Sequence, residues 1–265
     1  MHRIIKQSII ILVYLLIFLA ISTSVYYSYF RHIPNCYDNI KNQNEEEIDC
    51  GGYCIPCELM NIKDIEVIWS KIIPNKTGFY DLAAQIWNPN QNYGTGYLPY
   101  TFELYDLQDQ LIAQYSGRTF ILPNQTKYLL NLRAKNTNKP EFIKLVFGQV
   151  EWEKPDDYSS SQLTIQQKQY SFSQVSAILF NESNYDFDKI DIDILLFDAS
   201  HNLIGINSTE IRALLSWQKR DFIATWFEEV KGQVVFVEIE PETNIFDPSN
   251  RLPAKERGIE PFQDY

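Results

Sequence analysis

The sequence predicts an all-β protein in which two tandem β-sandwiches follow a single N-terminal transmembrane helix and a small disulfide-stapled module. Three observations support this prediction: a long apolar run near the N-terminus, four cysteines confined to a short stretch after it, and two matching strand patterns in the remainder. Aromatic residues make up 14% of the 265 residues, an enrichment that favours strands over helices.

The composition is that of a globular protein, with 45% hydrophobic and 22% charged residues. The net charge is −11, and Arg3 and Lys6 precede the apolar run without an accompanying acid. The rest of the chain therefore carries 21 basic and 34 acidic residues. A surface of this sign repels phosphate backbones and anionic lipid headgroups, so we expect no nucleic-acid partner.

The segment Ser8–Phe30 contains no charged residue. As a helix rising about 1.5 Å per residue it would reach roughly 34 Å, enough to cross the apolar core of a bilayer. Arg3 and Lys6 place the N-terminal tip in the cytoplasm by the positive-inside rule, and the bulk of the chain outside it. Tyr26, Tyr27, Tyr29 and Phe30 form an aromatic belt at the far end of the segment.

A cleaved signal peptide is the alternative to this signal anchor. The strongest apolar run, Ile9–Ile21, is short enough for a signal peptide, and Ser22–Ser24 supplies small residues at which a peptidase could cut. Both interpretations place everything after Arg31 outside the cytoplasm.

All four cysteines, Cys36, Cys50, Cys54 and Cys57, lie in one short stretch. Outside the cytoplasm thiols are oxidised, and so short a stretch cannot bury a core, so we expect two disulfides. A bond between Cys54 and Cys57 would be strained, which favours links from Cys36 and Cys50 to that pair, but the spacing leaves the pairing open. A four-thiolate zinc site is the alternative, although the first two cysteines lack the close spacing that such a site prefers.

Between the first two cysteines lies an acidic loop, residues 38–49, whose oxygens offer calcium ligands. Its spacing is not that of an EF-hand, and a solvated loop is the simpler interpretation. The stretch from Cys36 through Asp49-Cys50-Gly51-Gly52 to Cys57 resembles a "DCGGxCxxC" module of bacterial envelope proteins. This resemblance implies a cellular location more than an activity.

Two blocks of sequence recur later in the chain. Residues 84–88 match residues 177–181 at a shift of 93 positions, and residues 100–106 match residues 192–198 at a shift of 92. In Ile190–Leu196 every second residue is apolar and acids occupy two of the places between, the pattern of a half-buried strand.

The same alternation places Phe102 and Leu104 inside the first sandwich. It also places Asp191 and Asp193 on a solvated face, as it does Glu151 and Glu153. We interpret these acids as surface charges that discourage edge-to-edge pairing rather than as a glycosidase pair.

Phe102-Glu103-Leu104-Tyr105-Asp106 resembles the signature of the FxLYD family. An apolar pair, Leu111-Ile112, and the turn Leu122–Thr126 follow it, as in that family. The later segment Ile194–Asp198 keeps the pattern without the leading Phe and the Tyr. The resemblance implies immunoglobulin-like β-sandwiches in an exported protein, with no catalytic residue and no cofactor.

These patterns divide the chain into seven parts. They are a cytoplasmic tip (1–7), the transmembrane helix (8–30), the cysteine module (31–58), the first sandwich (59–154), a linker (155–161), the second sandwich (162–240) and an extended tail (241–265).

The sequence carries few residues suited to catalysis. Its three histidines have no recognisable nucleophile partner, and no phosphate-binding loop or zinc-protease motif is present, so we expect a non-enzyme without cofactor or metal. Tyr93, Tyr97 and Tyr100 lie in a segment of no regular period and are the candidates for a binding surface, since tyrosine is enriched at recognition sites. The alternative is that these tyrosines fasten a long connection between sheets.

The sequence therefore favours a membrane-anchored extracytoplasmic protein that makes protein–protein contacts in an envelope assembly or at the cell surface. An adhesin or carbohydrate-binding module is the alternative.

Overall fold

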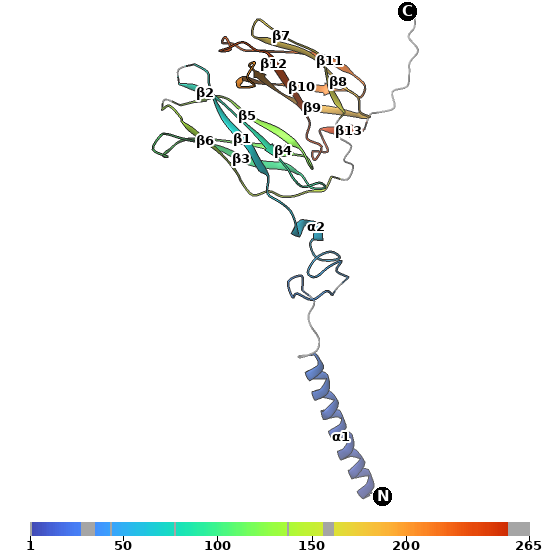
Figure 1. Ribbon diagram of the computed structural model, residues 1–265. Coiled ribbons are helices and arrows are strands. Elements are labelled where there is room, and N and C mark those ends of the chain that lie inside the picture. The colour runs from blue at the N-terminus through green and yellow to red at the C-terminus, as the bar shows by residue number, and fades with distance from the viewer. Residues whose placement is uncertain are drawn as a thin grey trace, which may run out of the picture. The chain divides into compact units, whose positions relative to one another are not determined.

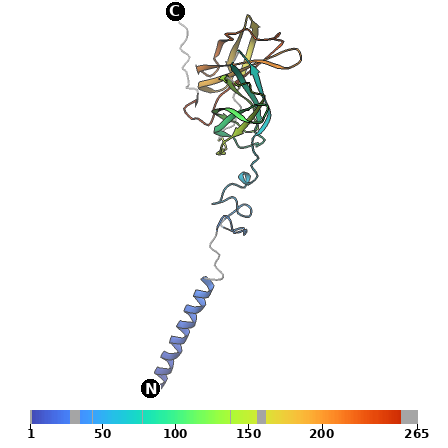
Figure 2. The same ribbon diagram turned by 90° about the vertical axis from the view of Figure 1, so that its left-hand side faces the viewer.

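The computed structural model describes residues 2–27, 35–42, 44–76, 78–136, 138–155 and 162–253. The chain divides into two compact units, residues 1–62 and residues 63–265 (Figures 1 and 2). The first unit holds the N-terminal helix and the cysteine module, and the second holds the strands of both sandwiches. The predicted all-β class with an N-terminal helix is confirmed.

Helix α1 spans His2–Val25. Its segment Ile5–Val25 is long and apolar enough to cross a membrane, a property that a signal sequence shares. No side chain in this segment is buried by the rest of the chain. Of the predicted aromatic belt, Tyr26 and Tyr27 follow the helix and are exposed, whereas Tyr29 and Phe30 lie outside the described residues. A short second helix, α2 (Cys57–Met60), ends the cysteine module.

Six antiparallel strands in two sheets, ordered β1-β2-β5 and β4-β3-β6, form the first sandwich. Their bounds are β1 Glu66–Pro74, β2 Phe79–Trp87, β3 Thr95–Tyr105, β4 Leu111–Ile121, β5 Thr126–Lys135 and β6 Phe142–Phe147. Leu82 and Ile86 of one sheet pack against Phe102 and Leu104 of the other, and all four side chains are fully buried. The predicted inward orientation of Phe102 and Leu104 is confirmed.

The second sandwich has sheets ordered β7-β8-β11 and β10-β9-β12, and a short strand, β13, also pairs with β9. The bounds are β7 Leu163–Ser171, β8 Gln174–Asn181, β9 Tyr185–Phe197, β10 Leu203–Leu214, β11 Lys219–Thr225, β12 Phe236–Glu242 and β13 Arg251–Pro253. Ile190, Ile192, Ile194 and Leu196 are fully buried, as the alternation predicts.

Strands β7 to β12 repeat the order of β1 to β6 in both sheets. Local contacts recur too. The Asn88 side chain donates hydrogen bonds to the carbonyls of Tyr93 and Leu122, and the Asn181 side chain donates to those of Tyr185 and Leu215. Each asparagine closes the end of its sandwich in the same way.

The hairpin turns after β3 and β9 also match. Asp106 accepts hydrogen bonds from the backbone of Gln108 and Gln110, and Asp198 accepts them from Ser200 and Asn202. Each aspartate side chain therefore caps the turn that it begins.

The second sandwich extends beyond its predicted end at Glu240. Strand β12 continues to Glu242, and β13 pairs with Tyr185–Phe187 of β9. Pro241 fits because β12 is an edge strand, where a missing backbone N–H leaves no ladder bond unmade. The extended tail predicted from residue 241 is therefore wrong as far as Pro253, and residues 254–265, like most of the predicted linker, lie outside the described residues.

Candidate functional site at the joint between the two sandwiches

The two sandwiches stack on each other, so that four sheets form successive layers (Figure 1). The contact, which we call the joint, lies between the outer face of β1-β2-β5 and the outer face of β10-β9-β12. Its apolar centre buries Ile73, Ala83, Leu195, Leu203 and Ile206, with Trp69, Tyr128, Leu130 and Phe197 packed around them.

The joint overturns the prediction of a solvated position for Asp193 but not for Asp191, whose side chain is 42% exposed and pairs with Lys189 (2.7 Å). Leu195 and Phe197 share this face with Asp191 and Asp193, and Leu195 is fully buried against the first sandwich. An alternation of apolar and polar residues predicts that successive side chains point to opposite faces of a sheet. It does not predict what covers each face. The apolar pair that follows the two acids was the sequence signal for a covered face.

A chain of hydrogen bonds crosses the joint. Trp69 Nε1 donates to Gln85 Oε1 (2.8 Å), Gln85 Nε2 donates to the Tyr128 hydroxyl (3.2 Å), and that hydroxyl donates to Glu238 Oε2 of the second sandwich (2.8 Å). Burial and the Glu238 carboxylate raise the pKa of Tyr128. The polar groups within this contact are therefore paired, and a paired network fixes the register of the two faces.

A buried ion pair lies at one end of the joint. Lys127 of β5 pairs with Glu242 of β12, and both side chains are almost completely buried. The Glu242 carboxylate also accepts a hydrogen bond from Gln125 Nε2 (3.1 Å), and the Lys127 ammonium lies 3.7 Å from the centre of the Phe120 ring. Burial raises the pKa of Glu242, and the Lys127 charge opposes that shift.

Asp193 lies beside this pair and adds negative charge to the joint. Desolvation raises its pKa to about 7, with the Glu242 carboxylate adding to the shift and Lys127 opposing it. Burial and the Asp193 charge also raise the pKa of Tyr100. One lysine thus faces two carboxylates, and the proton on Asp193 relieves part of their repulsion near neutral pH.

The three candidate tyrosines differ in exposure. Tyr93 is only 6% exposed, Tyr100 is half-buried with its ring 5.7 Å from that of Phe102, and Tyr97 is 56% exposed. The segment predicted to lack regular structure enters strand β3 at Thr95. Tyr93 and Tyr100 thus fit the alternative interpretation, in which tyrosines fasten a connection.

Gly94 and Gly96, beside these tyrosines, leave room for the side chain of Phe246 from the second sandwich. A Cβ on Gly96 would lie 2.7 Å from Cβ of Phe246, and one on Gly94 would lie 2.8 Å from Cζ of the same ring. Asn244 Nδ2 also donates to the Gly96 carbonyl (3.3 Å). The segment expected to bind a partner therefore binds the loop between β12 and β13 of its own chain.

Each end of the joint opens into a cleft lined by both sandwiches. The cleft of about 310 Å³ contains the buried Asp81, whose pKa is raised by desolvation, together with Arg133, Trp226 and Phe227. The cleft of about 370 Å³ at the other end includes the exposed Tyr97 among charged and amide side chains.

The segment after β11 reaches over the 310 Å³ cleft to the first sandwich. Lys231 Nζ donates to the Asn75 carbonyl (3.1 Å), Glu228 pairs with Lys76 (3.2 Å), and the Arg133 guanidinium lies 4.7 Å from the Phe227 ring centre. Contacts between the sandwiches therefore cross the cleft at each end of the joint.

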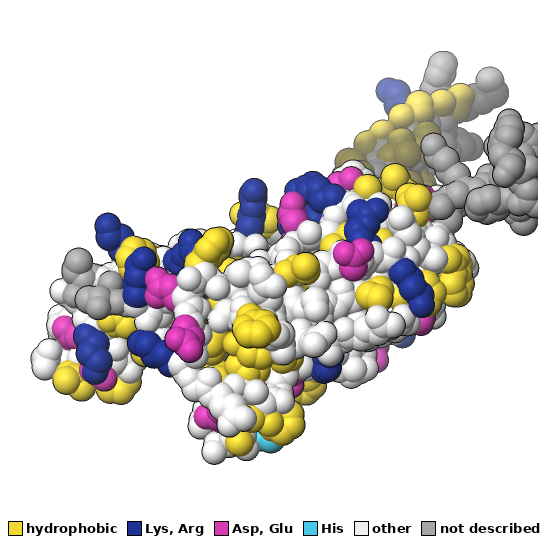
Figure 3. Space-filling model, turned by 90° about the horizontal axis from the view of Figure 1, so that it is seen from above, with side chains coloured by type: hydrophobic (Ala, Val, Ile, Leu, Met, Phe, Trp, Pro, Cys, Tyr) yellow, Lys and Arg dark blue, Asp and Glu magenta, His cyan; other side chains and the backbone are white. Residues whose placement is uncertain are grey.

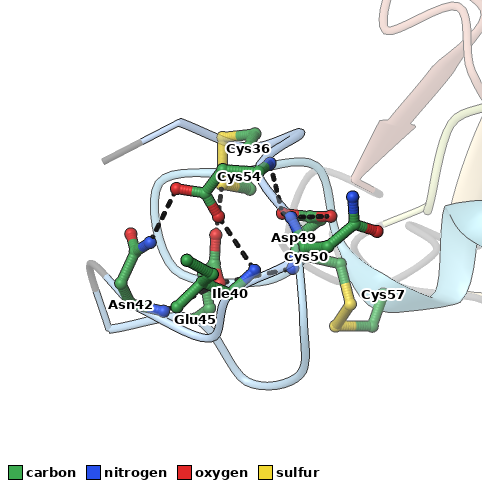
Figure 4. The surroundings of a disulfide bond; sticks show 10 residues. Cys36, Ile40, Asn42, Glu45, Asp49, Cys50, Cys54 and Cys57 are labelled. Atoms are coloured by element: carbon green, nitrogen blue, oxygen red, sulfur yellow. Dashed lines mark hydrogen bonds between the residues drawn. A yellow bond between two sulfur atoms is a disulfide. The ribbon is translucent and has the colours of Figure 1, made fainter. Parts of the chain in front are cut away.

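The cysteine module contains two disulfides, Cys36–Cys54 and Cys50–Cys57 (Figure 4). Cys36 and Cys50 are thus joined to the close pair, as the sequence favours. Glu45 Oε1 lies 3.2 Å from Sγ of Cys54, which has no proton to donate because it is in a disulfide. Cys36, Glu45 and Cys54 cluster closely enough for a metal, but the two sulfurs are bonded to each other rather than available as thiolate ligands.

Two carboxylates of the acidic loop accept hydrogen bonds from backbone N–H groups of the same loop. Glu45 is only 5% exposed and accepts hydrogen bonds from the backbone of Asn42 and Asp49. Asp49 accepts from the backbone of Asp38 and Asn39. The interpretation of a simply solvated loop is therefore wrong for Glu45, which organises the turn (Figure 4).

The remaining chemical candidates lie apart from the joint. Glu151 and Glu153 are exposed, as predicted. His201 occupies the turn after β9, where its ring stacks on Phe236 with the ring centres 4.5 Å apart. His32 lies outside the described residues.

No protein-family model matches the chain, and no curated protein matches it. The resemblances to the FxLYD family and to the DCGGxCxxC module therefore stay predictions.

Proposed function

We propose that this chain is a non-catalytic, membrane-anchored extracytoplasmic protein whose two sandwiches act as one rigid body in protein–protein contacts. The joint is the observation that supports this proposal most directly. Its apolar centre, its hydrogen-bond chain and the contacts across its two clefts hold the two sandwiches together. A body of this kind holds its outer sheet faces at fixed positions, which suits a scaffold.

Ionisable groups within the joint support a structural role over a catalytic one. Lys127, Glu242 and Asp193 interact with one another between the sandwiches, where they contribute to the contact. The apolar helix, the disulfides and the basic N-terminal tip are together consistent with a signal anchor whose N-terminus is cytoplasmic.

The second sandwich is, in this proposal, a degenerate repeat of the first, and both are immunoglobulin-like domains of the FxLYD type. The identical strand order and the matching asparagine and aspartate contacts support a repeat. The low sequence match between the copies follows from their different neighbours. Among the described residues, an outer face that lies in the joint in one copy has its equivalent outside the joint in the other copy.

The test is crosslinking of the full-length protein in membranes of its native cells, followed by mass spectrometry of captured proteins. A Leu195→Arg variant places a charge in the centre of the joint, and Leu107→Arg, at an exposed turn, is its matched control. We expect defined envelope proteins to be captured by the wild type and the control but not by the joint variant. Recovery of the chain outside the membrane fraction, or equal capture by all three, would contradict the proposal.

A neutral glycan is a second candidate ligand, favoured by the 310 Å³ cleft. The cleft combines the exposed Phe227 ring with the Trp226 ring, the Asp81 carboxylate and the Arg133 guanidinium. Aromatic walls with a few fixed polar groups are typical of small-ligand sites. Binding of soluble oligosaccharides that is lost in Phe227→Ala would support an adhesin, and the absence of binding at millimolar glycan would exclude this candidate.

A further inference from the structure

The joint shows that the sandwich fold of this protein can use one of its outer faces to bind another sandwich. In the first sandwich the outer face of β1-β2-β5 is covered by the second sandwich. Its counterpart in the second sandwich is the outer face of β7-β8-β11, which among the described residues lies outside the joint and which we call the free face. Figure 1 shows these strands at one extreme of the stack, and Figure 3 looks down on that side, where hydrophobic side chains lie among charged ones.

Four apolar side chains gather on the free face. Ile178 and Phe180 alternate with the core residues of β8 and point outward, where both are half-buried. Ile223 of β11 is 60% exposed, and Trp217 is 61% exposed with its ring 6.2 Å from that of Phe180. Large apolar groups this exposed are unusual on a solvated sheet when they adjoin one another.

The strand registers show which residues of the free face occupy the positions equivalent to residues of the joint. In the first sandwich Gln85 pairs with Tyr128, and the equivalent pair is Ile178 with Asp221. Leu130, which packs in the joint, corresponds to Ile223. The free face therefore keeps an apolar centre but carries a charge where the joint has the Tyr128 hydroxyl.

The free face carries charges of both signs, and its Lys219 ammonium also donates to Gln166 Oε1 (3.0 Å) and lies 4.7 Å from the Phe180 ring centre. Lys219 and Asp221 are two residues apart on β11 and so share one face of the sheet. If two β11 strands meet antiparallel about a two-fold axis, Lys219 of each copy lies opposite Asp221 of the other. Self-complementarity of this kind is the property that a two-fold interface requires.

The opposite outer face, on β4-β3-β6, is less suited to such a contact. Glu103 stands at the strand position that corresponds to Leu195 of the joint, and it accepts hydrogen bonds from Tyr105 (2.8 Å) and Gln114 (2.9 Å) of its own sheet. A buried contact would have to desolvate this carboxylate. A head-to-tail stack that used this face is therefore disfavoured relative to a two-fold pair.

We propose that two copies of this chain associate through their β7-β8-β11 faces about a two-fold axis, with Ile178, Phe180 and Ile223 at the centre and Lys219–Asp221 pairs beside them. The inference deepens the proposed function and rests on it, because it names a second copy as one protein partner. A three-stranded face is smaller than a standard stable interface, so we expect weak association in solution and stronger association between copies confined to one membrane.

The test uses full-length protein labelled with donor and acceptor dyes and reconstituted into lipid vesicles, with energy transfer between copies as the readout. Asp221→Lys and Lys219→Asp each place like charges opposite one another. We expect each to weaken association by roughly fivefold or more, since juxtaposed like charges oppose docking. The double variant Lys219→Asp/Asp221→Lys restores opposite charges across the axis, and we expect energy transfer to return to the wild-type level.

Lys144→Asp, an equivalent charge reversal on the outer face of β4-β3-β6, is the matched control and should leave energy transfer unchanged. Ile223→Glu provides an independent disruption, and unchanged melting temperatures establish that every variant is folded. Wild-type transfer in both single reversals and in Ile223→Glu, or a double variant that does not recover, overturns the inference.

A separate measurement, alkaline extraction of the membranes, tests the proposed function. If the wild-type chain leaves the membrane fraction on alkaline extraction, the anchor is wrong. The charge-reversal series can then be repeated with the full chain in solution at high concentration, where restoration by the double variant would still support the two-fold contact.

Discussion

At the scale of single residues, Lys127 and Glu242 are the most consequential pair in the second unit. Each charge is almost completely buried, so each depends on the other for compensation. The Phe120 ring below the ammonium and the Gln125 amide beside the carboxylate complete the surroundings of the pair. A pair of this kind contributes to specificity because a displaced joint would leave two uncompensated charges.

Removal of one partner should therefore cost more than removal of both. We expect Lys127→Met to lower the free energy of unfolding by about 3–5 kcal/mol, because Glu242 stays buried without a counter-charge. The double variant Lys127→Met/Glu242→Leu should recover most of that loss. Urea unfolding of the full chain measures both, with the exposed Lys139→Met as a control that should leave stability close to the wild-type value.

Asp193 predicts how stability depends on pH. Its folded-state pKa is raised to about 7, so between its ordinary value of 3.8 and pH 7 the folded chain holds a proton that the unfolded chain has released. Stability therefore falls as pH rises through this window, by up to about 1.4 kcal/mol per pH unit, and levels off above it. Melting temperatures between pH 5 and 8 should show this decline in the wild type and a flatter profile in Asp193→Asn. An equal decline in both would contradict the assignment to Asp193.

At the scale of elements, the start of β3 and the loop between β12 and β13 form a matched pair. Gly94 and Gly96 leave the space that Phe246 occupies, and Asn244 ties the loop to the strand. The small size of Gly96 is thus explained by a side chain of the other sandwich, whereas Gly94 is also confined by the Ile121 carbonyl of its own sandwich.

We expect Gly96→Ala to lower the free energy of unfolding by about 1–3 kcal/mol, because its Cβ would overlap Cβ of Phe246 and force a shift in the loop. Hydrogen exchange should also accelerate in residues 243–250. Gln91→Ala, at an exposed position of the same connection, is the control and should change neither quantity. Wild-type exchange in the glycine variant would show that the loop does not depend on this space.

At the scale of the whole molecule, the two units depend on different interactions. The first unit contains both disulfides, Cys36–Cys54 and Cys50–Cys57, whereas the second depends on three apolar clusters: one in each sandwich and one in the joint. The joint connects the two sandwiches of the second unit through a buried apolar cluster of their facing sheets.

Reduction of the disulfides should therefore unfold residues 36–57 and leave residues 63–253 intact. The module cannot compensate for the loss of its crosslinks with a core of its own, whereas the sandwiches contain no cysteine. Hydrogen exchange with and without reductant measures this in one experiment. Faster exchange in Ile190–Leu196 after reduction would contradict the independence of the two units.

The sequence by itself determined the features that depend on neighbouring residues. Alternation in Ile190–Leu196 specified a strand and its buried side, because side-chain direction in a strand is a property of the local backbone. Cysteine spacing within 22 positions specified a compact module with two disulfides.

Only the tertiary structure decided what covers the other side of each strand. Asp193 was expected in solvent and lies in the joint, and Tyr93 was expected at a binding surface and is buried. Lys127 and Glu242 gave no sequence signal as a pair, since 115 positions separate them. Local patterns fix directions within a strand, whereas the environment of a face is set by which distant sheet packs on it, and that depends on the summed complementarity of both faces.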